Sequence, residues 1–345
     1  MIHQITRAGK SLLAAGCTLS ILFASDSYAA TALNVSQQPL FLTQGVAPNL
    51  LFTLDDSGSM AWAYVPDGIS GNSGRAGRSS DYNALYYNPD YAYQVPKKLT
   101  LSGDQIIVSD YPVPRFTAAW QDGYAQGSTT NLSNNYRPQW GTGWLGCIDS
   151  SCNTGRAYYY TYKVSASCPA QPVSSSNSCY TYNALPTSQE SNFAIWYSYY
   201  RNRILATKTA ANLAFYSLPE NVRLTWGALN TCSIGANSRS CQNNALLQFN
   251  KQHKINFFNW LANSPASGGT PLHAALDRAG RFLQTNGTAY TTEDGKTYSC
   301  RASYHIMMTD GIWNGRNVTP GNLDNQNQTL SLIHISEPTR QAEIS

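Results

Sequence analysis

The chain has 345 residues, which is enough for one large domain or two small ones. Only 12% of the residues are charged, about half of the roughly 25% that is usual in globular proteins, whereas tyrosine occurs 23 times. A hydrophobic content of 42% suffices for a packed core and excludes wholesale disorder. The net charge of +4 is small and dispersed, which argues against a nucleic-acid-binding groove. This composition suits an exterior surface better than a cytosolic enzyme.

Residues 1–30 have the pattern of a secretory signal peptide. Two basic residues precede a mostly apolar stretch, 11–24, which is too short to span a bilayer. Small residues favour cleavage after Ala29 or Ala30. The alternative is a lipoprotein signal that would use Cys17, although the apolar run before that cysteine is very short. No later stretch approaches the roughly 20 apolar residues of a membrane helix, so we expect an exported chain without a transmembrane segment.

The other end of the chain has an unusual sequence. Residues 330–340 read LSLIHISEPTR, which resembles the in-frame translation of an adapter used to build sequencing libraries. We therefore interpret residues 330–345 as an artefact and expect the natural sequence to be readable only to about Thr329. The alternative is a genuine short strand followed by a tail.

The cysteines outside the signal peptide fall into three close pairs and one remainder. In an exported chain, close pairs favour disulfides over zinc. Pairing by proximity would join Cys147 to Cys152, Cys168 to Cys179 and Cys232 to Cys241. Cys300 is then either buried and free or bonded to a partner outside this sequence. Two histidines in apolar-patterned segments, His273 and His305, are predicted to be satisfied structural side chains.

The first predicted element is a strand over 46–54, because this short apolar run is typical of a strand buried on both faces. The segment 60–190 differs in composition from the rest of the chain. It holds 15 of the 23 tyrosines and many Gly, Ser, Asn and Pro, and it has no long helical periodicity. We predict a large loop-rich insertion with short strands, pinned by two disulfides. Its aromatic side chains either form a recognition surface or pack the insertion.

Helices and strands alternate after the insertion. The predicted elements are a helix over 192–218, a strand over 222–229, helices over 250–261 and 271–284, and a buried strand over 303–309. Pro219 terminates the first helix, and Thr270 and Pro271 suit the N-cap and first position of the helix that follows them. This alternation indicates an α/β fold with a parallel sheet.

Three short motifs lie where predicted strands end or a predicted helix begins. They are Asp55-x-Ser57-x-Ser59, Gly268-Gly269-Thr270-Pro271 and Thr309-Asp310-Gly311. In an open parallel sheet such loops gather at the carboxyl edge, where ligands bind. Carboxylates and hydroxyls are the hard oxygen donors preferred by Mg²⁺, Ca²⁺ or Mn²⁺, not by zinc. Each motif alone is usually a turn or a cap, but their order and context together favour a metal site. Because some ligands are neutral, a bound cation would keep positive charge and accept an acidic group from a partner.

In this order, Asp55, Ser57, Ser59, Thr270 and Asp310 resemble the metal-ion-dependent adhesion site of the von Willebrand factor A domain. Five segments within about residues 40–320 resemble the PilC/PilY family of type IV pilus-associated proteins. They are VAPNLLFTLDDSGSM, YNALYYNPD, FAIWYSYYRNRILATKTA, SGGTPL and SYHIMMTDGIWN. The resemblance implies a von Willebrand factor A-like, doubly wound and mainly parallel sheet over 31–329, interrupted by the insertion. It also implies an exported factor for pilus assembly and retraction balance, located at the pilus tip or outer membrane and implicated in adhesion.

Two parts of the family pattern are missing from this sequence. They are the β-propeller with its calcium-binding loop and the last strands and helices of the A domain. A parallel sheet without its last strands is expected to expose an edge and apolar faces.

Three functions are compatible with the sequence. The first is a pilus-tip adhesin that uses Mg²⁺ or Ca²⁺ at this site, with minor pilins or the pilus tip as partners and a host or surface ligand. The second is a purely structural pilus-initiation component that docks minor pilins. The third, a metal-dependent exported hydrolase, is disfavoured because GxSxG, HExxH and a paired general acid and base are absent from the sequence. We therefore expect a binding protein and not an enzyme.

Overall fold

The computed structural model describes residues 46–285, 287–291, 295–298, 301–315 and 318. The predicted signal peptide with Cys17, the unpaired Cys300 and the tail at 330–345 lie outside the described residues, and these interpretations stay predictions. Among the described residues, no helix combines the length and apolarity needed to cross a membrane.

A mainly parallel sheet organises the described chain. Strand β1 (Asn49–Leu54) lies between β10 (Arg223–Ala228) and β12 (Ser303–Met308) and runs parallel to both, while β11 (Leu247–Gln248) pairs antiparallel with β10. Every residue of β1 and β10 is buried, as expected for strands covered on both faces. The mixed α/β class and the strands predicted at 46–54 and 222–229 are confirmed.

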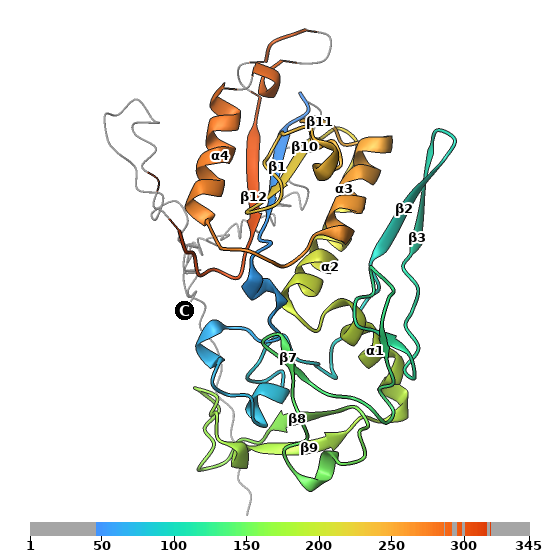
Figure 1. Ribbon diagram of the computed structural model, residues 1–345, viewed down its shortest axis with the longest axis vertical. Coiled ribbons are helices and arrows are strands. Elements are labelled where there is room, and N and C mark those ends of the chain that lie inside the picture. The colour runs from blue at the N-terminus through green and yellow to red at the C-terminus, as the bar shows by residue number, and fades with distance from the viewer. Residues whose placement is uncertain (1–45, 286, 292–294, 299–300, 316–317, 319–345) are drawn as a thin grey trace, which may run out of the picture. The chain divides into compact units, whose positions relative to one another are not determined.

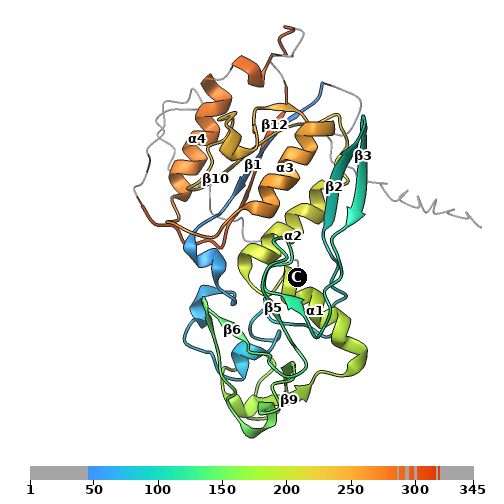
Figure 2. The ribbon, with the colours of Figure 1, turned by 45° about the vertical axis from the view of Figure 1, so that its right-hand side comes forward.

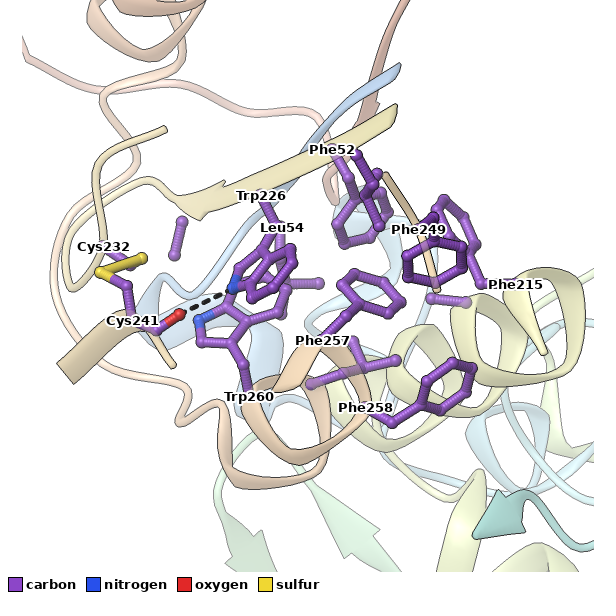
Figure 3. Close-up of a cluster of buried hydrophobic side chains, with 14 of the residues drawn as sticks. Phe52, Leu54, Phe215, Trp226, Cys232, Cys241, Phe249, Phe257, Phe258 and Trp260 are labelled. Carbon is purple, nitrogen blue, oxygen red and sulfur yellow. Dashed lines mark hydrogen bonds between the residues drawn. A yellow bond between two sulfur atoms is a disulfide. The ribbon is translucent and has the colours of Figure 1, made fainter. Parts of the chain in front are cut away.

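Helices cover both faces of this sheet. Helices α2 (Arg203–Phe215) and α3 (Lys251–Asn263) lie on one face, and α4 (Leu272–Thr285) lies on the other (Figures 1 and 2). On the α3 side, the fully buried Phe257 ring contacts the rings of Phe52, Phe215 and Trp226 (Figure 3). On the α4 side, a smaller cluster joins Leu272 of the helix to Met307 of β12. The helices predicted at 250–261 and 271–284 are confirmed.

The single helix predicted over 192–218 is wrong, because the structure divides it into α1 (Glu190–Tyr199) and α2. Asn202 has extended backbone and its side-chain oxygen accepts a hydrogen bond from Leu205 N at 3.1 Å, so it caps a new helix. The two helices also face different cores: α1 buries Phe193 with the insertion, whereas α2 buries Phe215 against the sheet. The apolar periodicity continues across the break, which is why the sequence pattern did not show it.

Strand β12 confirms the predicted position but not the predicted burial. Its residues alternate in exposure, with Tyr304 at 39% and Ile306 at 41%. Among the described strands β12 forms an edge of the sheet, so β1 is its only neighbour there. Within the described part of the chain, the expected edge strand with exposed apolar side chains is therefore observed.

The segment 60–190 is rich in loops and contains short strands, as predicted, together with 3-10 turns. Its strands form hairpins: β2 (Lys97–Ser102) with β3 (Gln105–Asp110), β4 (Ala119–Trp120) with β5 (Thr129–Thr130), β6 (Gln139–Trp140) with β7 (Gly143–Trp144), and β8 (Tyr158–Tyr162) with β9 (Tyr180–Ala184). Short 3-10 helices occur at Asp67–Ile69, Ala76–Arg78, Ser150–Cys152, Asn177–Cys179 and Thr187–Gln189. Helix α1 packs against this part of the chain.

A second core of aromatic side chains holds the insertion together. Its buried members include Tyr86, Tyr87, Tyr136, Tyr158, Tyr160 and Tyr180 together with Phe193 and Trp196 of α1. The buried hydroxyls find partners: those of Tyr86 and Tyr136 lie 2.9 Å apart, and Arg78 donates to the Tyr158 hydroxyl at 2.6 Å. These aromatic residues therefore pack the insertion, which is one of the two predicted roles.

The predicted disulfides form in the described part of the chain. The structure joins Cys147 to Cys152, Cys168 to Cys179 and Cys232 to Cys241. The first two lie in the insertion, and the third staples the loop after β10, where Trp226 Nε1 donates to the carbonyl of Cys241 at 2.9 Å (Figure 3). All three pairs predicted by proximity are therefore confirmed.

Candidate metal site at the carboxyl edge of the sheet

The first and third motifs meet because β1 and β12 are parallel neighbours. Leu54 lies opposite Met308, and Asp55 N donates to the carbonyl of Met308 at 2.8 Å as the strands end. The Thr309 hydroxyl then donates to Asp55 Oδ2 at 2.7 Å. The parallel topology therefore brings together two loops that are 254 residues apart in the sequence.

The loop after β1 is folded by its own side chains. Asp55 is fully buried, and its Oδ1 accepts a hydrogen bond from Ser57 N at 2.8 Å. The hydroxyls of Ser57 and Ser59 lie 3.1 Å apart where a short 3-10 turn, Gly58–Ala61, begins. Burial raises the pKa of Asp55, while hydrogen bonds from Ser57 and Thr309 act in the opposite direction. A cation beside this carboxylate would favour its charged form.

The Gly-Gly-Thr-Pro turn packs against the same loop. Gly58 N donates to the carbonyl of Gly268 at 3.1 Å. Gly268 has a φ of +103°, and a Cβ there would lie 2.8 Å from the side chain of Asn230, so this close approach requires glycine. Thr270 is buried, and its backbone N donates to Asn314 Oδ1 at 2.8 Å. The turn is thereby tied both to the loop after β1 and to the segment after β12.

Asp310 has one satisfied and one unsatisfied oxygen. Its Oδ2 accepts a hydrogen bond from Arg203 Nη1 at 2.6 Å, and the two side chains are only 4% and 3% exposed. Its Oδ1 is buried and has no hydrogen-bond partner among the described residues. A buried carboxylate oxygen normally has a donor or a cation beside it. Asp310 Oδ1 is therefore a buried acceptor position without a donor among the described residues.

Arg203 is a residue of this site that the sequence analysis missed. It is the first residue of α2, and it contacts Asp310 after β12 and Asp67 in the insertion. The signal in the sequence is a basic side chain at the start of a helix rich in apolar residues, where a buried charge needs a partner. Its partners could not be deduced because they come from segments more than 100 residues away in either direction.

Asp56 has a different role from the neighbouring Asp55. Its Oδ1 accepts from the backbone N and side-chain Nδ2 of Asn230, both at 2.9 Å, and its Oδ2 accepts from Thr231 N at 3.0 Å and from Thr231 Oγ1 at 2.7 Å. All of these bonds are made by a side chain with no exposed surface. Asp56 therefore anchors the loop after β10, and its oxygens are already occupied.

The two histidines differ from each other. His305 Nε2 lies 2.8 Å from the Thr53 hydroxyl, and burial lowers the pKa of His305 to about 4, so its predicted structural role is confirmed. His273 is buried against the ring of Trp313, but neither of its ring nitrogens has a hydrogen-bond partner among the described residues. The prediction that His273 is satisfied is therefore not met within the described chain.

The side chains of the three motifs at the carboxyl edge of the sheet offer carboxylate and hydroxyl oxygens, which are hard metal ligands. In the described ranges no three His, Cys, Asp or Glu side chains gather as metal ligands would. A cation held by Asp55 and Asp310 would therefore also need hydroxyl oxygens, which Ser57, Ser59 and Thr270 offer. A cavity of about 530 Å³ adjoins Asp310, between residues 65–68 of the insertion, α2 and residues 309–312.

These features define a class of protein: a mixed α/β protein with acidic and hydroxyl side chains at the carboxyl edge of a mainly parallel sheet. Comparison with known proteins then identifies relatives. The chain is 48% identical over 343 residues to the type IV pilus biogenesis factor PilY1 of Pseudomonas aeruginosa strain PAK, and 46% identical over 344 residues to the PilY1 of strain PAO1. These alignments cover 95% and 96% of this chain. The resemblance to the PilC/PilY family is thereby confirmed.

The similarity covers only part of each relative. The chain spans 29% of the length of both PilY1 proteins. No protein-family profile matches the chain. No solved structure matches it either, so the likeness to the von Willebrand factor A domain rests on the motifs and on the topology described above.

Proposed function

We propose that this chain is the metal-binding adhesion module of an exported type IV pilus assembly and tip protein. The observation that carries the proposal is the convergence of Asp55 and Asp310 at one sheet edge, with Asp310 Oδ1 buried and unpartnered among the described residues. The names of the relatives supply the link to the pilus. The order of the motifs supplies the link to the von Willebrand factor A fold.

The proposed ligands of the cation are Asp55, Ser57, Ser59, Thr270 and Asp310. The two carboxylates balance the formal charge of a bound Mg²⁺ or Ca²⁺, and the three hydroxyls are neutral and weaker donors, so the cation would remain a better acceptor than in a site built of carboxylates alone. When bound, the cation would supply an open coordination position for an acidic group of a partner. The protein holds its own ligands in place: the Thr309 hydroxyl and Ser57 N fix the Asp55 carboxylate, and the loops exclude water from it.

Two partner classes fit this site. An adhesin would present the cation to a host or surface ligand, whereas a pilus-initiation component would present it to minor pilins. Most insertion tyrosines pack into a core, so fewer of them are available to form an aromatic binding surface. The metal site and the adjoining cavity are therefore the surface that we propose for partner binding. An enzymatic role gains no support, because this site offers ligands and no activated nucleophile.

Pilus counts and adherence separate the two partner classes. Asp55→Ala and Asp310→Ala would be introduced into the complete protein in a piliated strain, with Asp104→Ala as control because the Asp104 side chain is 93% exposed and far from the site in sequence. We expect both site variants to lose adherence while Asp104→Ala does not. Retained pili would identify the adhesin function, and lost pili would identify the assembly function. Wild-type pili and adherence in both site variants would contradict the proposal.

A further inference from the structure

The guanidinium of Arg203 is buried and divided between two carboxylates. Nη1 donates to Asp310 Oδ2 at 2.6 Å, Nη2 pairs with Asp67 Oδ1, and Nε donates to the carbonyl of Tyr64 at 2.8 Å. The rings of Trp62 and Tyr64 each lie 5.2 Å from its central carbon. A buried cation with all of its nitrogens engaged is well stabilised where it lies.

The same carboxylate is a proposed ligand of the metal ion. Arg203 uses Oδ2 of Asp310, and only Oδ1 is left without a described partner. A positive charge held at hydrogen-bond distance from a ligand opposes the binding of a second positive charge to that ligand. The opposition is strong here because both side chains are shielded from water.

We propose that Arg203 competes with the cation for Asp310 and thereby sets the metal affinity of the site. The inference rests on the proposed function, since it concerns the regulation of that same site. In the described conformation Arg203 acts as an internal counter-ion for Asp310. Binding of a metal ion weakens the Arg203–Asp310 pair and leaves Arg203 held by Asp67.

The insertion takes part in this competition because it provides the second carboxylate. Asp67 lies in the turn Asp67–Ile69, close in sequence to Trp62 and Tyr64, which flank the guanidinium, and Arg203 N donates to the carbonyl of Trp62 at 3.0 Å. Residues 65–68 and 309–312 both line the cavity beside Asp310. A partner that enters this cavity contacts both carboxylate-bearing segments. The insertion is therefore a route by which partner binding changes cation affinity.

Calorimetric titration of Mg²⁺ and of Ca²⁺ into the full chain tests the competition. Arg203→Gln removes the competing charge, and we expect cation affinity to rise by about tenfold or more. Asp67→Asn leaves Asp310 as the only carboxylate partner of Arg203 within the described ranges, and we expect affinity to fall by about threefold or more. When Arg203→Gln is already present, we expect Asp67→Asn to change cation affinity by less than about twofold, because Asp67 acts on the site through Arg203.

The two single variants protect the test against misfolding. Arg203 is buried, so Arg203→Gln requires a thermal melt to show that it folds, whereas Asp67 is 20% exposed and its substitution leaves Arg203 paired with Asp310. Unchanged or weaker cation binding in folded Arg203→Gln would overturn the inference, as would unchanged or tighter binding in Asp67→Asn. In those cases the proposed function stands, provided that Asp55→Ala abolishes binding. If the wild type binds no cation, the proposed function fails as well.

Discussion

Asp55 and Asp56 are adjacent acidic residues, yet the structure predicts opposite consequences for their removal. Asp56 has no exposed surface, and its carboxylate accepts two hydrogen bonds from Asn230 and two from Thr231. Asp56→Ala leaves these donors without acceptors at the junction between the loops that follow β1 and β10. We therefore expect Asp56→Ala to reduce the stability of the fold directly.

The magnitude follows from these bonds. A hydrogen bond to a charged group contributes about 1.5–3 kcal/mol, and bonds shared by neighbouring residues add incompletely. Removal of one partner from a buried charged network costs about 3–5 kcal/mol, so we expect a loss of about 4 kcal/mol in the free energy of unfolding. Asp56→Asn retains the Oδ1 acceptor for Asn230 and should lose about half as much, about 2 kcal/mol.

Urea denaturation followed by circular dichroism measures these losses. The matched control is Asp104→Ala, which removes a carboxylate that is 93% exposed and should change stability by less than about 0.5 kcal/mol. The expected order of stability is wild type and Asp104→Ala, then Asp56→Asn, then Asp56→Ala. A loss below about 1 kcal/mol in Asp56→Ala would refute the anchoring role.

Three further outcomes are expected. Phe257→Ala should lower the free energy of unfolding by about 3–5 kcal/mol because its buried ring packs on Phe52 and Trp226, and a loss below about 1 kcal/mol in urea denaturation would contradict this packing. Replacing Cys232 and Cys241 together by Ser opens a loop with a sequence separation of 9 and should cost about 3 kcal/mol in the same assay, with no such difference from wild type under reducing conditions. Burial lowers the pKa of His305 to about 4, so its contribution to stability is fully present above the ordinary value of 6.5 and is lost as the pH falls towards 4. That loss amounts to up to about 3 kcal/mol, and a pH dependence of unfolding that is identical in His305→Gln would exclude it.

The sequence predicted the elements whose side chains follow a simple pattern. The uninterrupted apolar runs of β1 and β10 identify buried strands, and the Thr-Pro pair marks the start of α4. A parallel sheet brings the loops after its strands to one edge, and in the structure Asp55 accepts a hydrogen bond from Thr309, which precedes Asp310.

Features that depend on tertiary contacts were not predictable in this way. The break at Asn202 leaves the apolar spacing intact, since α1 and α2 each bury a face against a different core. The burial of β12 depends on what lies beside it in the sheet and not on its own composition. The roles of the insertion tyrosines could not be assigned because recognition and packing use the same side chains.

The central pairing of the site belongs to this second group. Arg203 meets Asp67 and Asp310 only after the insertion and the last described strand have folded around α2. Asp55 and Asp56 differ in role because the backbone turns one towards β12 and the other towards the loop after β10. Neither distinction is encoded in residue type or spacing.

The central claim is that Asp55 and Asp310 hold a divalent cation at the carboxyl edge of the sheet. The most direct test is calorimetric titration of Mg²⁺ and Ca²⁺ into the wild type, Asp55→Ala, Asp310→Ala and the control Asp104→Ala. We expect the wild type and Asp104→Ala to bind one cation per chain with equal affinity, and Asp55→Ala and Asp310→Ala to lose that binding. Equal affinity in all four proteins, or no binding by the wild type, would contradict the claim.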